Sequence, residues 1–169
     1  MTRISRACLE INAQMPQTLD QLDRRLLALL QANARLSADK IGAEIGLSPS
    51  AVQRRIARLR ESGAISAEVA IVDPGTAGYP LSMIVDVEVE RERPELLAAF
   101  KRWIMREGAV QEAWYVTGDS DFVLVIAARD IPDYDGLMHR MVSENANIRR
   151  FRTRVALGTL KRGAAVPLE

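Results

Sequence analysis

The sequence contains a single cysteine, Cys8, and a single histidine, His139, among its 169 residues. One cysteine excludes a disulfide within the chain and leaves a reducing compartment as the natural setting. One histidine and one distant cysteine supply no metal-ligand set and no Cys/His or Ser/His/Asp catalytic arrangement. A glycine-rich phosphate loop is also missing. The sequence therefore predicts no catalytic residue, no metal site and no cofactor, and His139 is interpreted as a surface or boundary residue.

Long apolar runs are missing as well. No segment approaches the roughly 18 apolar residues of a membrane-spanning helix, and polar residues interrupt positions 1–17 before they could form the apolar part of a secretory signal. Hydrophobic residues make up 48% and charged residues 27% of the chain, which is typical of a globular protein rather than a disordered one. We therefore expect a cytoplasmic protein that makes no membrane contact.

The chain also has little net charge, because its formal value is only +1. Residues 20–72 carry eight Lys/Arg and six Asp/Glu, whereas residues 73–169 carry thirteen and fifteen. So weak a bias gives no general attraction to polyanions. Any contact with nucleic acid must therefore be concentrated on one surface.

One segment, residues 47–63, encodes such a surface and reads L-S-P-S-A-V-Q-R-R-I-A-R-L-R-E-S-G. Ser48 can cap a helix, Pro49 suits its first position, and Gly63 can end it. Apolar residues recur along one side, while the other side is basic and meets no acid before Glu61. Taken alone, such a helix fits a solvated surface as well as it fits DNA binding.

The segment before this helix favours DNA binding. Leucines between Leu19 and Leu30 share one face of a first helix that ends near Asn33, and Ser37 can cap a second, shorter helix. Gly46 ends the second helix shortly before the next one begins. Two short helices joined by a tight glycine-containing turn are typical of a helix-turn-helix, whose second helix enters the major groove.

Residues near the start of a recognition helix reach base edges, where arginine suits guanine and glutamine suits adenine. Arg55 lies nearer the apolar stripe than the other arginines, so we assign it to a phosphate contact or to an internal ion pair. The DNA-binding candidates are Ser48, Ser50, Gln53, Arg54, Arg55 and Arg58.

Two features follow the helix. Alternating apolar residues at positions 65–71 predict a short strand that acts as a wing or as the start of a connector. Positions 73–80, D-P-G-T-A-G-Y-P, contain four Gly or Pro and predict a hinge. We therefore divide the chain into a flexible tail (1–17), a winged helix-turn-helix domain (18–72), the hinge (73–80), a second domain (81–162) and a tail (163–169).

The second domain alternates strands and helices. Strands are predicted near 81–89, 110–117, 122–128 and 150–157, with helices that begin at Pro94 and Pro132. This order, strand-helix-strand-strand-helix-strand, is the split ferredoxin-like arrangement, so the expected fold class is α+β. The third strand is apolar on both faces, which makes the sheet face without helices a candidate contact between copies of the chain. A two-fold dimer would also supply the symmetry of paired DNA half-sites.

The loop Gly118-Asp119-Ser120-Asp121 joins the second and third strands. Glycine and aspartate favour tight turns, so a hairpin turn alone would explain these residues. Two carboxylates in one loop would also suit the ammonium group of a ligand. The sequence leaves both interpretations open.

Three motifs occur in a characteristic order: L-D-Q-L-D-R-R-L-L at 19–27, I-G-L-S-P-S-A-V-Q-R-R-I at 45–56, and V-T-G-D-S-D-F at 116–122. They resemble the Lrp/AsnC (feast/famine, leucine-responsive regulatory protein) family of transcriptional regulators, over about residues 19–161. The resemblance implies a sensing domain that forms dimers and often tetramers or octamers, with an amino acid bound between sensing domains near the G-D-x-D loop. On this basis the effector-binding candidates, with Asp121 the strongest, are Thr117, Gly118, Asp119, Ser120, Asp121 and Arg154.

The sequence therefore predicts a homo-oligomeric, sequence-specific regulator of transcription that binds double-stranded DNA, responds to an amino acid and is not an enzyme. Two alternatives remain. Siroheme decarboxylases resemble both halves of the family but use histidines for chemistry, and this chain has only His139. A sensing protein that no longer binds DNA is the other alternative, and the four-arginine helix argues against it.

Overall fold

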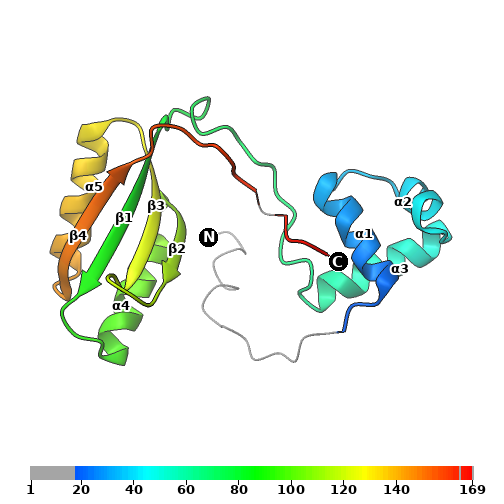
Figure 1. The fold of residues 1–169 in the computed structure, drawn as a ribbon, viewed down its shortest axis with the longest axis horizontal. Helices are drawn as coiled ribbons and strands as arrows, with labels where there is room; N and C mark the ends of the chain where they lie inside the picture. The colour runs from blue at the N-terminus through cyan, green and yellow to red at the C-terminus, as the bar shows by residue number, and fades with distance from the viewer. Residues whose placement is uncertain (1–17, 164, 169) are drawn as a thin grey trace. The chain divides into compact units, whose positions relative to one another are not determined.

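The computed structural model describes residues 18–163 and 165–168, so the predicted flexible tail at 1–17, including Cys8, lies outside the described residues. The chain divides into two compact units (Figure 1). The N-terminal unit extends to Ala70 and also takes in the chain from Lys161 onward, and the C-terminal unit is Ile71–Leu160. No helix in the described ranges is long and apolar enough to cross a membrane.

Three helices form the N-terminal unit: α1 (Gln21–Ala32), α2 (Ala38–Ile45) and α3 (Pro49–Glu61). Each begins at a side-chain cap, because Asp20, Ser37 and Ser48 accept a hydrogen bond from the backbone N–H three residues further on. The apolar faces of the three helices meet in one core, and its buried members are Leu26, Leu27, Ile41, Ile45, Val52 and Leu59.

Two glycines allow the tight turn between α2 and α3. Gly46 adopts the left-handed conformation, with φ of 75°. At Gly42 the backbone of the turn approaches so closely that an added Cβ would lie 2.4 Å from the Leu47 carbonyl oxygen. The Leu47 N–H donates to the Gly42 carbonyl (2.9 Å), and the Leu47 side chain packs on the helical core. The predicted helix-turn-helix is therefore confirmed.

The strand predicted at positions 65–71 is wrong, and the helix-turn-helix has no wing strand among the described residues. Ile65 packs on the helical core, but Val69 and Ile71 are exposed. The segment is held by Glu68, whose carboxylate accepts two hydrogen bonds from Arg60 (2.9 and 3.1 Å). An alternating pattern forms a strand only where a neighbouring strand supplies hydrogen-bond partners, and none does so here.

The C-terminal unit contains four strands and two helices. In chain order they are β1 (Leu81–Val89), α4 (Pro94–Arg106), β2 (Val110–Tyr115), β3 (Phe122–Ala128), α5 (Ile131–Glu144) and β4 (Ile148–Val155). The strands form an antiparallel sheet in the order β2-β3-β1-β4. Figure 1 shows both helices on the same face of this sheet. The predicted split ferredoxin-like α+β arrangement is confirmed.

Alternate residues of each central strand point to opposite faces. Val85 of β1 and Leu124 of β3 are fully buried against α4 and α5. On the other face, Ile84 and Val125 are half-buried, and Trp114 of β2 is 46% exposed. Within this unit no helix covers that second face, which we call the open face of the sheet.

The predicted hinge at residues 73–80 contains a turn in which the Tyr79 N–H donates to the Pro74 carbonyl (2.7 Å). Its role as a hinge stays a prediction.

Residues 165–168 are part of the N-terminal unit. The Gln31 side chain donates to the Val166 carbonyl (3.0 Å) and accepts from the Val166 N–H (2.7 Å). A single side-chain amide thus pairs with both polar groups of one residue's backbone, as a neighbouring strand would. Leu168 packs against the helical core. The segment that the sequence predicted as a tail therefore completes the N-terminal unit.

Replacing the leucine at the end of this segment, Leu168→Ala, should destabilise the N-terminal unit and leave the sheet unaffected. We expect a loss of about 1 kcal/mol, because Leu168 is only partly buried and fully buried leucines lose roughly 2–5 kcal/mol. Hydrogen exchange of α1 and β1 peptides measures the two units separately. Leu160→Ala is the matched control, since Leu160 is fully exposed. Unchanged exchange in α1 would contradict the prediction.

Candidate functional site

The residues predicted to contact DNA lie on α3 or at its cap, and the structure separates them into two groups. The first group is exposed and comprises Ser48, Ser50, Gln53 and Arg54. Ser48 Oγ accepts from the Ala51 N–H (3.3 Å) and lies 3.2 Å from Ser50 Oγ. Arg54 makes no hydrogen bond or ion pair with any described residue. Its guanidinium group is therefore available to an external partner.

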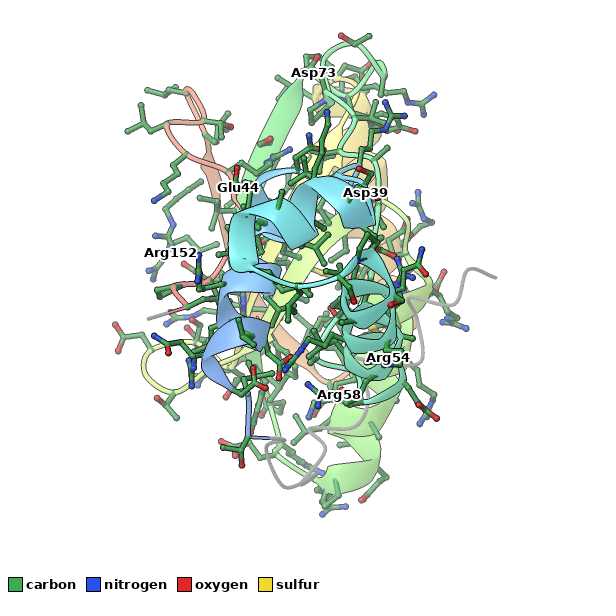
Figure 2. All side chains as sticks on the ribbon, turned by 90° about the vertical axis from the view of Figure 1, so that its right-hand side faces the viewer. Asp39, Glu44, Arg54, Arg58, Asp73 and Arg152 are labelled. Atoms are coloured by element: carbon green, nitrogen blue, oxygen red, sulfur yellow. The ribbon has the colours of Figure 1, made fainter. Side chains whose placement is uncertain are left out.

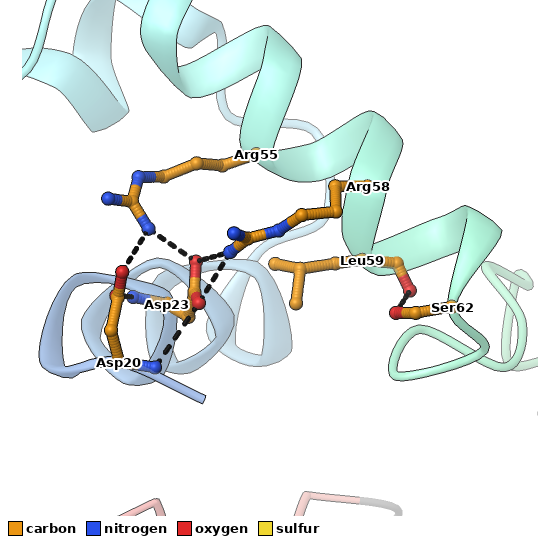
Figure 3. A network of polar contacts seen from close by, with 6 residues as sticks. All are labelled: Asp20, Asp23, Arg55, Arg58, Leu59 and Ser62. Carbon is orange, nitrogen blue, oxygen red and sulfur yellow. Dashed lines mark hydrogen bonds and ion pairs between the residues drawn. The ribbon is translucent and has the colours of Figure 1, made fainter. Parts of the chain in front are cut away.

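The second group, Arg55 and Arg58, reaches from α3 to the start of α1 (Figure 3). Arg55 Nη1 donates to Asp20 Oδ2 (2.6 Å) and to Asp23 Oδ1 (2.7 Å). Arg58 Nη2 donates to both oxygens of Asp23, at 2.7 and 2.6 Å. Of the two roles predicted for Arg55, the internal ion pair is the one present, and Arg58 belongs to the same network.

Local helix geometry brings these four side chains together. Asp20 caps α1 by accepting from the Asp23 N–H (2.7 Å), and Asp23 completes a capping box by accepting from the Asp20 N–H (3.3 Å). Arg55 and Arg58 lie three residues apart and so share one side of α3. Hydrogen bonding by Arg55 lowers the pKa of Asp20 below its ordinary value, so this carboxylate stays ionised to a lower pH than a free aspartate does.

A shallow hollow lies beside α3, and Figure 2 labels two of its residues, Arg54 and Arg58. Its lining is mostly basic and consists of Leu47, Ala51, Arg54, Arg55 and Arg58. Two of the three arginines are neutralised by Asp20 and Asp23, whereas Arg54 is not. The hollow suits an anionic group.

In the C-terminal unit, the G-D-S-D loop is a turn held by main-chain contacts. Gly118 has φ of 120°, a conformation that favours glycine. The Asp121 N–H donates to the Val87 carbonyl (3.0 Å), and Asp121 Oδ2 accepts from the Val89 N–H (2.7 Å). Asp121, the strongest effector candidate from the sequence, therefore ties the loop to β1, and its role in effector binding stays a prediction.

Other residues of the loop face a cleft of about 160 Å³ on the open face of the sheet. Its lining is almost entirely charged or polar and consists of Asp86, Glu88, Asp119, Ser120, Arg150, Phe151 and Arg152. Of the predicted effector residues, only Asp119 and Ser120 line it. The sequence analysis did not identify the cleft residues on β1 and β4. A signal was present, because the acids at 86 and 88 and the arginines at 150, 152 and 154 occupy every second position, as residues on one face of a sheet do.

Most charges at this cleft are paired. Arg150 and Glu88 form an ion pair at 2.6 Å, and hydrogen bonding by Arg150 lowers the pKa of Glu88. Arg154, a predicted effector residue, pairs with Asp86. Arg152 and Asp119 make no hydrogen bond or ion pair with the described residues. One positive and one negative group at the cleft thus form no ion pair, although Arg152 interacts electrostatically with Glu88 and Asp119 with Arg150.

Nothing in the described ranges places three or more His, Cys, Asp or Glu side chains where they could hold a metal ion. His139 is exposed on α5, where its Nε2 lies 3.6 Å from Asp135 Oδ2. Its interpretation as a surface residue is confirmed.

Known families match both units of the chain. The AsnC-type helix-turn-helix domain matches residues 19–60, and the Lrp/AsnC ligand binding domain matches residues 82–166. The chain belongs to the Lrp/AsnC family. The resemblance noted in the sequence is thereby confirmed, and this family member is a DNA-binding transcriptional regulator.

Individual relatives agree with this family membership. An HTH-type transcriptional regulator of Sinorhizobium fredii is 41% identical over 160 residues, which cover 95% of each chain. The crystal structure of an AsnC family transcriptional regulator from Agrobacterium tumefaciens has a TM-score of 0.83 and 29% identity, covering 89% of this chain and 97% of the other. A feast or famine regulatory protein from M. tuberculosis, complexed with L-methionine, has a TM-score of 0.78 and 26% identity, with coverage of 88% and 99%. Such relatives favour regulation over the decarboxylase alternative.

Two substitutions in the G-D-S-D loop test whether Asp121 stabilises the unit and Asp119, which lines the cleft, does not. Asp121→Ala leaves the Val89 N–H without its acceptor, so we expect a loss of about 1–3 kcal/mol in the free energy of unfolding. Asp119→Ala should have almost no effect on stability, because Asp119 is exposed and unpaired. Denaturant unfolding followed by tryptophan fluorescence, at one protein concentration, reports on this unit through Trp103 and Trp114. Equal stabilities would contradict the assignment.

Proposed function

We propose that this regulator recognises its operator through Ser50, Gln53 and Arg54 of α3, and that an amino acid bound at the C-terminal unit controls this binding. The observation that carries the first part is the unpaired Arg54 on the exposed side of a helix-turn-helix recognition helix. The first turn of α3 contains no acidic residue, so its free N–H groups and positive dipole end favour the negatively charged DNA backbone.

Each exposed side chain then has a distinct role. Arg54 donates two hydrogen bonds to O6 and N7 of a guanine, and Gln53 pairs with an adenine. Ser48 and Ser50, at the start of α3, contact phosphate or the nearest base edge. Arg55 and Arg58, already paired with Asp20 and Asp23, are left out of base recognition.

Charges at the cleft support an amino-acid effector. A free α-amino acid carries one carboxylate and one ammonium group at neutral pH, and Arg152 and Asp119 are the two unpaired charges that match them. The complex of the M. tuberculosis relative with L-methionine supports the same ligand class. Ser120 adds a hydroxyl group to the cleft, and Thr117 and Gly118 shape the loop that carries it.

The open face of the sheet supports a homodimer, and the family resemblance is our basis for proposing that this dimer assembles further to a tetramer or octamer. Half-buried Ile84, Val123 and Val125 lie there beside the exposed Trp114, and such an apolar strip is suited to a second copy of the chain. A two-fold dimer presents two copies of α3 to paired half-sites. Because the partner is chromosomal DNA, we place this activity in the cytoplasm.

Arg54→Ala tests the recognition surface. Selection from random duplexes with the purified protein supplies a preferred sequence, and fluorescence anisotropy then gives affinities for it and for a scrambled duplex. We expect a loss of about 1–3 kcal/mol on the preferred sequence and a smaller loss on the scrambled one. Arg60→Ala, on the same helix but paired with Glu68, is the control and should change little. Equal losses on both duplexes would reassign Arg54 to a phosphate contact.

A thermal-shift screen against the twenty amino acids tests the effector cleft. A ligand at 100 times its Kd stabilises the native state by about 2.7 kcal/mol and raises its melting temperature. Arg152→Ala and Asp119→Ala should each reduce that shift, because each removes one charge that meets the ligand. Arg149→Ala, on β4 but outside the cleft lining, should preserve it. A full shift in both cleft variants, or no shift with any amino acid, would refute this site.

A further inference from the structure

Asp23 is the only buried charged side chain among the described residues, with 1% of its surface exposed. A carboxylate removed from water requires compensating partners. Asp23 has them from two directions: its own helix supplies the Asp20 N–H, and α3 supplies Arg55 and Arg58. Both carboxylate oxygens of Asp23 therefore accept hydrogen bonds, from the arginines of α3 and from the N–H group of the capping box.

The two arginines that Asp23 binds are not buried to the same degree. The Arg55 side chain is 23% exposed and the Arg58 side chain is 47% exposed. Both line the hollow that also contains Arg54. Without an acidic partner, Arg58 would be a free cation one helical turn from Arg54, and like charges at this spacing repel each other.

Pairing these arginines inside the protein affects DNA binding in a particular way. Contacts between basic side chains and phosphate are independent of sequence and supply most non-specific affinity. Asp20 and Asp23 reduce the net charge of the three hollow-lining arginines from +3 to +1. Affinity for arbitrary DNA therefore falls, while the contacts of Arg54 with base edges are retained.

We propose that Asp23 is a positioning residue for DNA recognition, which holds Arg55 and Arg58 against α1 so that Arg54 is the guanidinium that α3 presents to DNA. The inference rests on the proposed function, since it takes α3 as the recognition helix. It also revises the assignment of Arg58 as a direct DNA contact. Asp23 acts by restraining two arginines and raises the ratio of specific to non-specific affinity.

The dependence of binding on salt tests this proposal, because each phosphate contact adds about 0.9 to the slope of log K against log salt. Wild-type, Arg54→Gln and Arg58→Gln proteins are titrated onto a scrambled duplex at several salt concentrations. We expect Arg54→Gln to weaken binding at low salt, and Arg58→Gln to leave the slope unchanged because the restrained Arg58 contacts no phosphate. If Arg58→Gln lowers the slope by about 0.9 or more, Arg58 contacts phosphate directly and the proposal is overturned.

Asp23→Asn provides the second arm, since it keeps the shape of the side chain and removes its charge. The released Arg58 should strengthen binding to the scrambled duplex several-fold, steepen the slope by about 0.9 and reduce the specificity ratio, while Arg55 keeps its ion pair with Asp20. Asp23→Asn with Arg58→Gln should reverse most of the gain. Asp39→Asn is the matched control, because it removes one exposed charge from the first turn of α2.

A purely structural role for Asp23 predicts the opposite result: weaker binding to both duplexes with an unchanged slope. Circular dichroism shows whether Asp23→Asn remains folded, and if it unfolds, the Arg58→Gln comparison decides alone. Failure of the proposed function has a different outcome. If Arg54→Gln alters binding to neither the preferred nor the scrambled duplex, α3 is not the recognition helix, whatever Arg58→Gln does.

Discussion

The need to neutralise one buried carboxylate connects the fold of the N-terminal unit with its function. Asp23 belongs to the capping box that starts α1, and it also receives the guanidinium groups of Arg55 and Arg58 from α3. The same interaction therefore begins one helix, joins it to the recognition helix and neutralises two of the cations that line the hollow beside α3. Desolvation offsets much of the attraction between the charges of such an ion pair, so its net contribution to stability is small, whereas removal of one partner leaves a buried charge unpaired and is destabilising.

The C-terminal unit is governed by a different constraint, the burial of only one face of its sheet. Helices α4 and α5 cover the face that contains Val85 and Leu124, so the second face keeps a mixed surface. Towards β2 that surface is apolar, around Trp114, and towards β4 it is charged, where Arg150 and Arg154 meet acids of β1. A protein contact and a polar ligand cleft can thus occupy neighbouring parts of one sheet.

Local signals in the sequence predicted most of this architecture. Caps at Ser37 and Ser48, helical periodicity and the three family motifs were sufficient for the helix-turn-helix and the split ferredoxin-like unit. What could not be predicted depends on partners distant in the chain. The alternating residues at 65–71 lack a neighbouring strand, and the pairs Asp20–Arg55 and Gln31–Val166 span 35 and 135 positions. The D-x-x-D and R-x-x-R spacings were visible signals, but sequence alone does not show that they face each other.

The distant pairing of Gln31 with Val166 also changes how the two units are related along the chain. Because residues 165–168 complete the helical core, the C-terminal unit is inserted within the sequence of the N-terminal unit. The chain leaves the N-terminal unit after Ala70 and re-enters it at Lys161, so two covalent connections join the units. The two connections lead to different helices: the first follows α3 through the segment held by Glu68, and the second reaches α1 through Gln31.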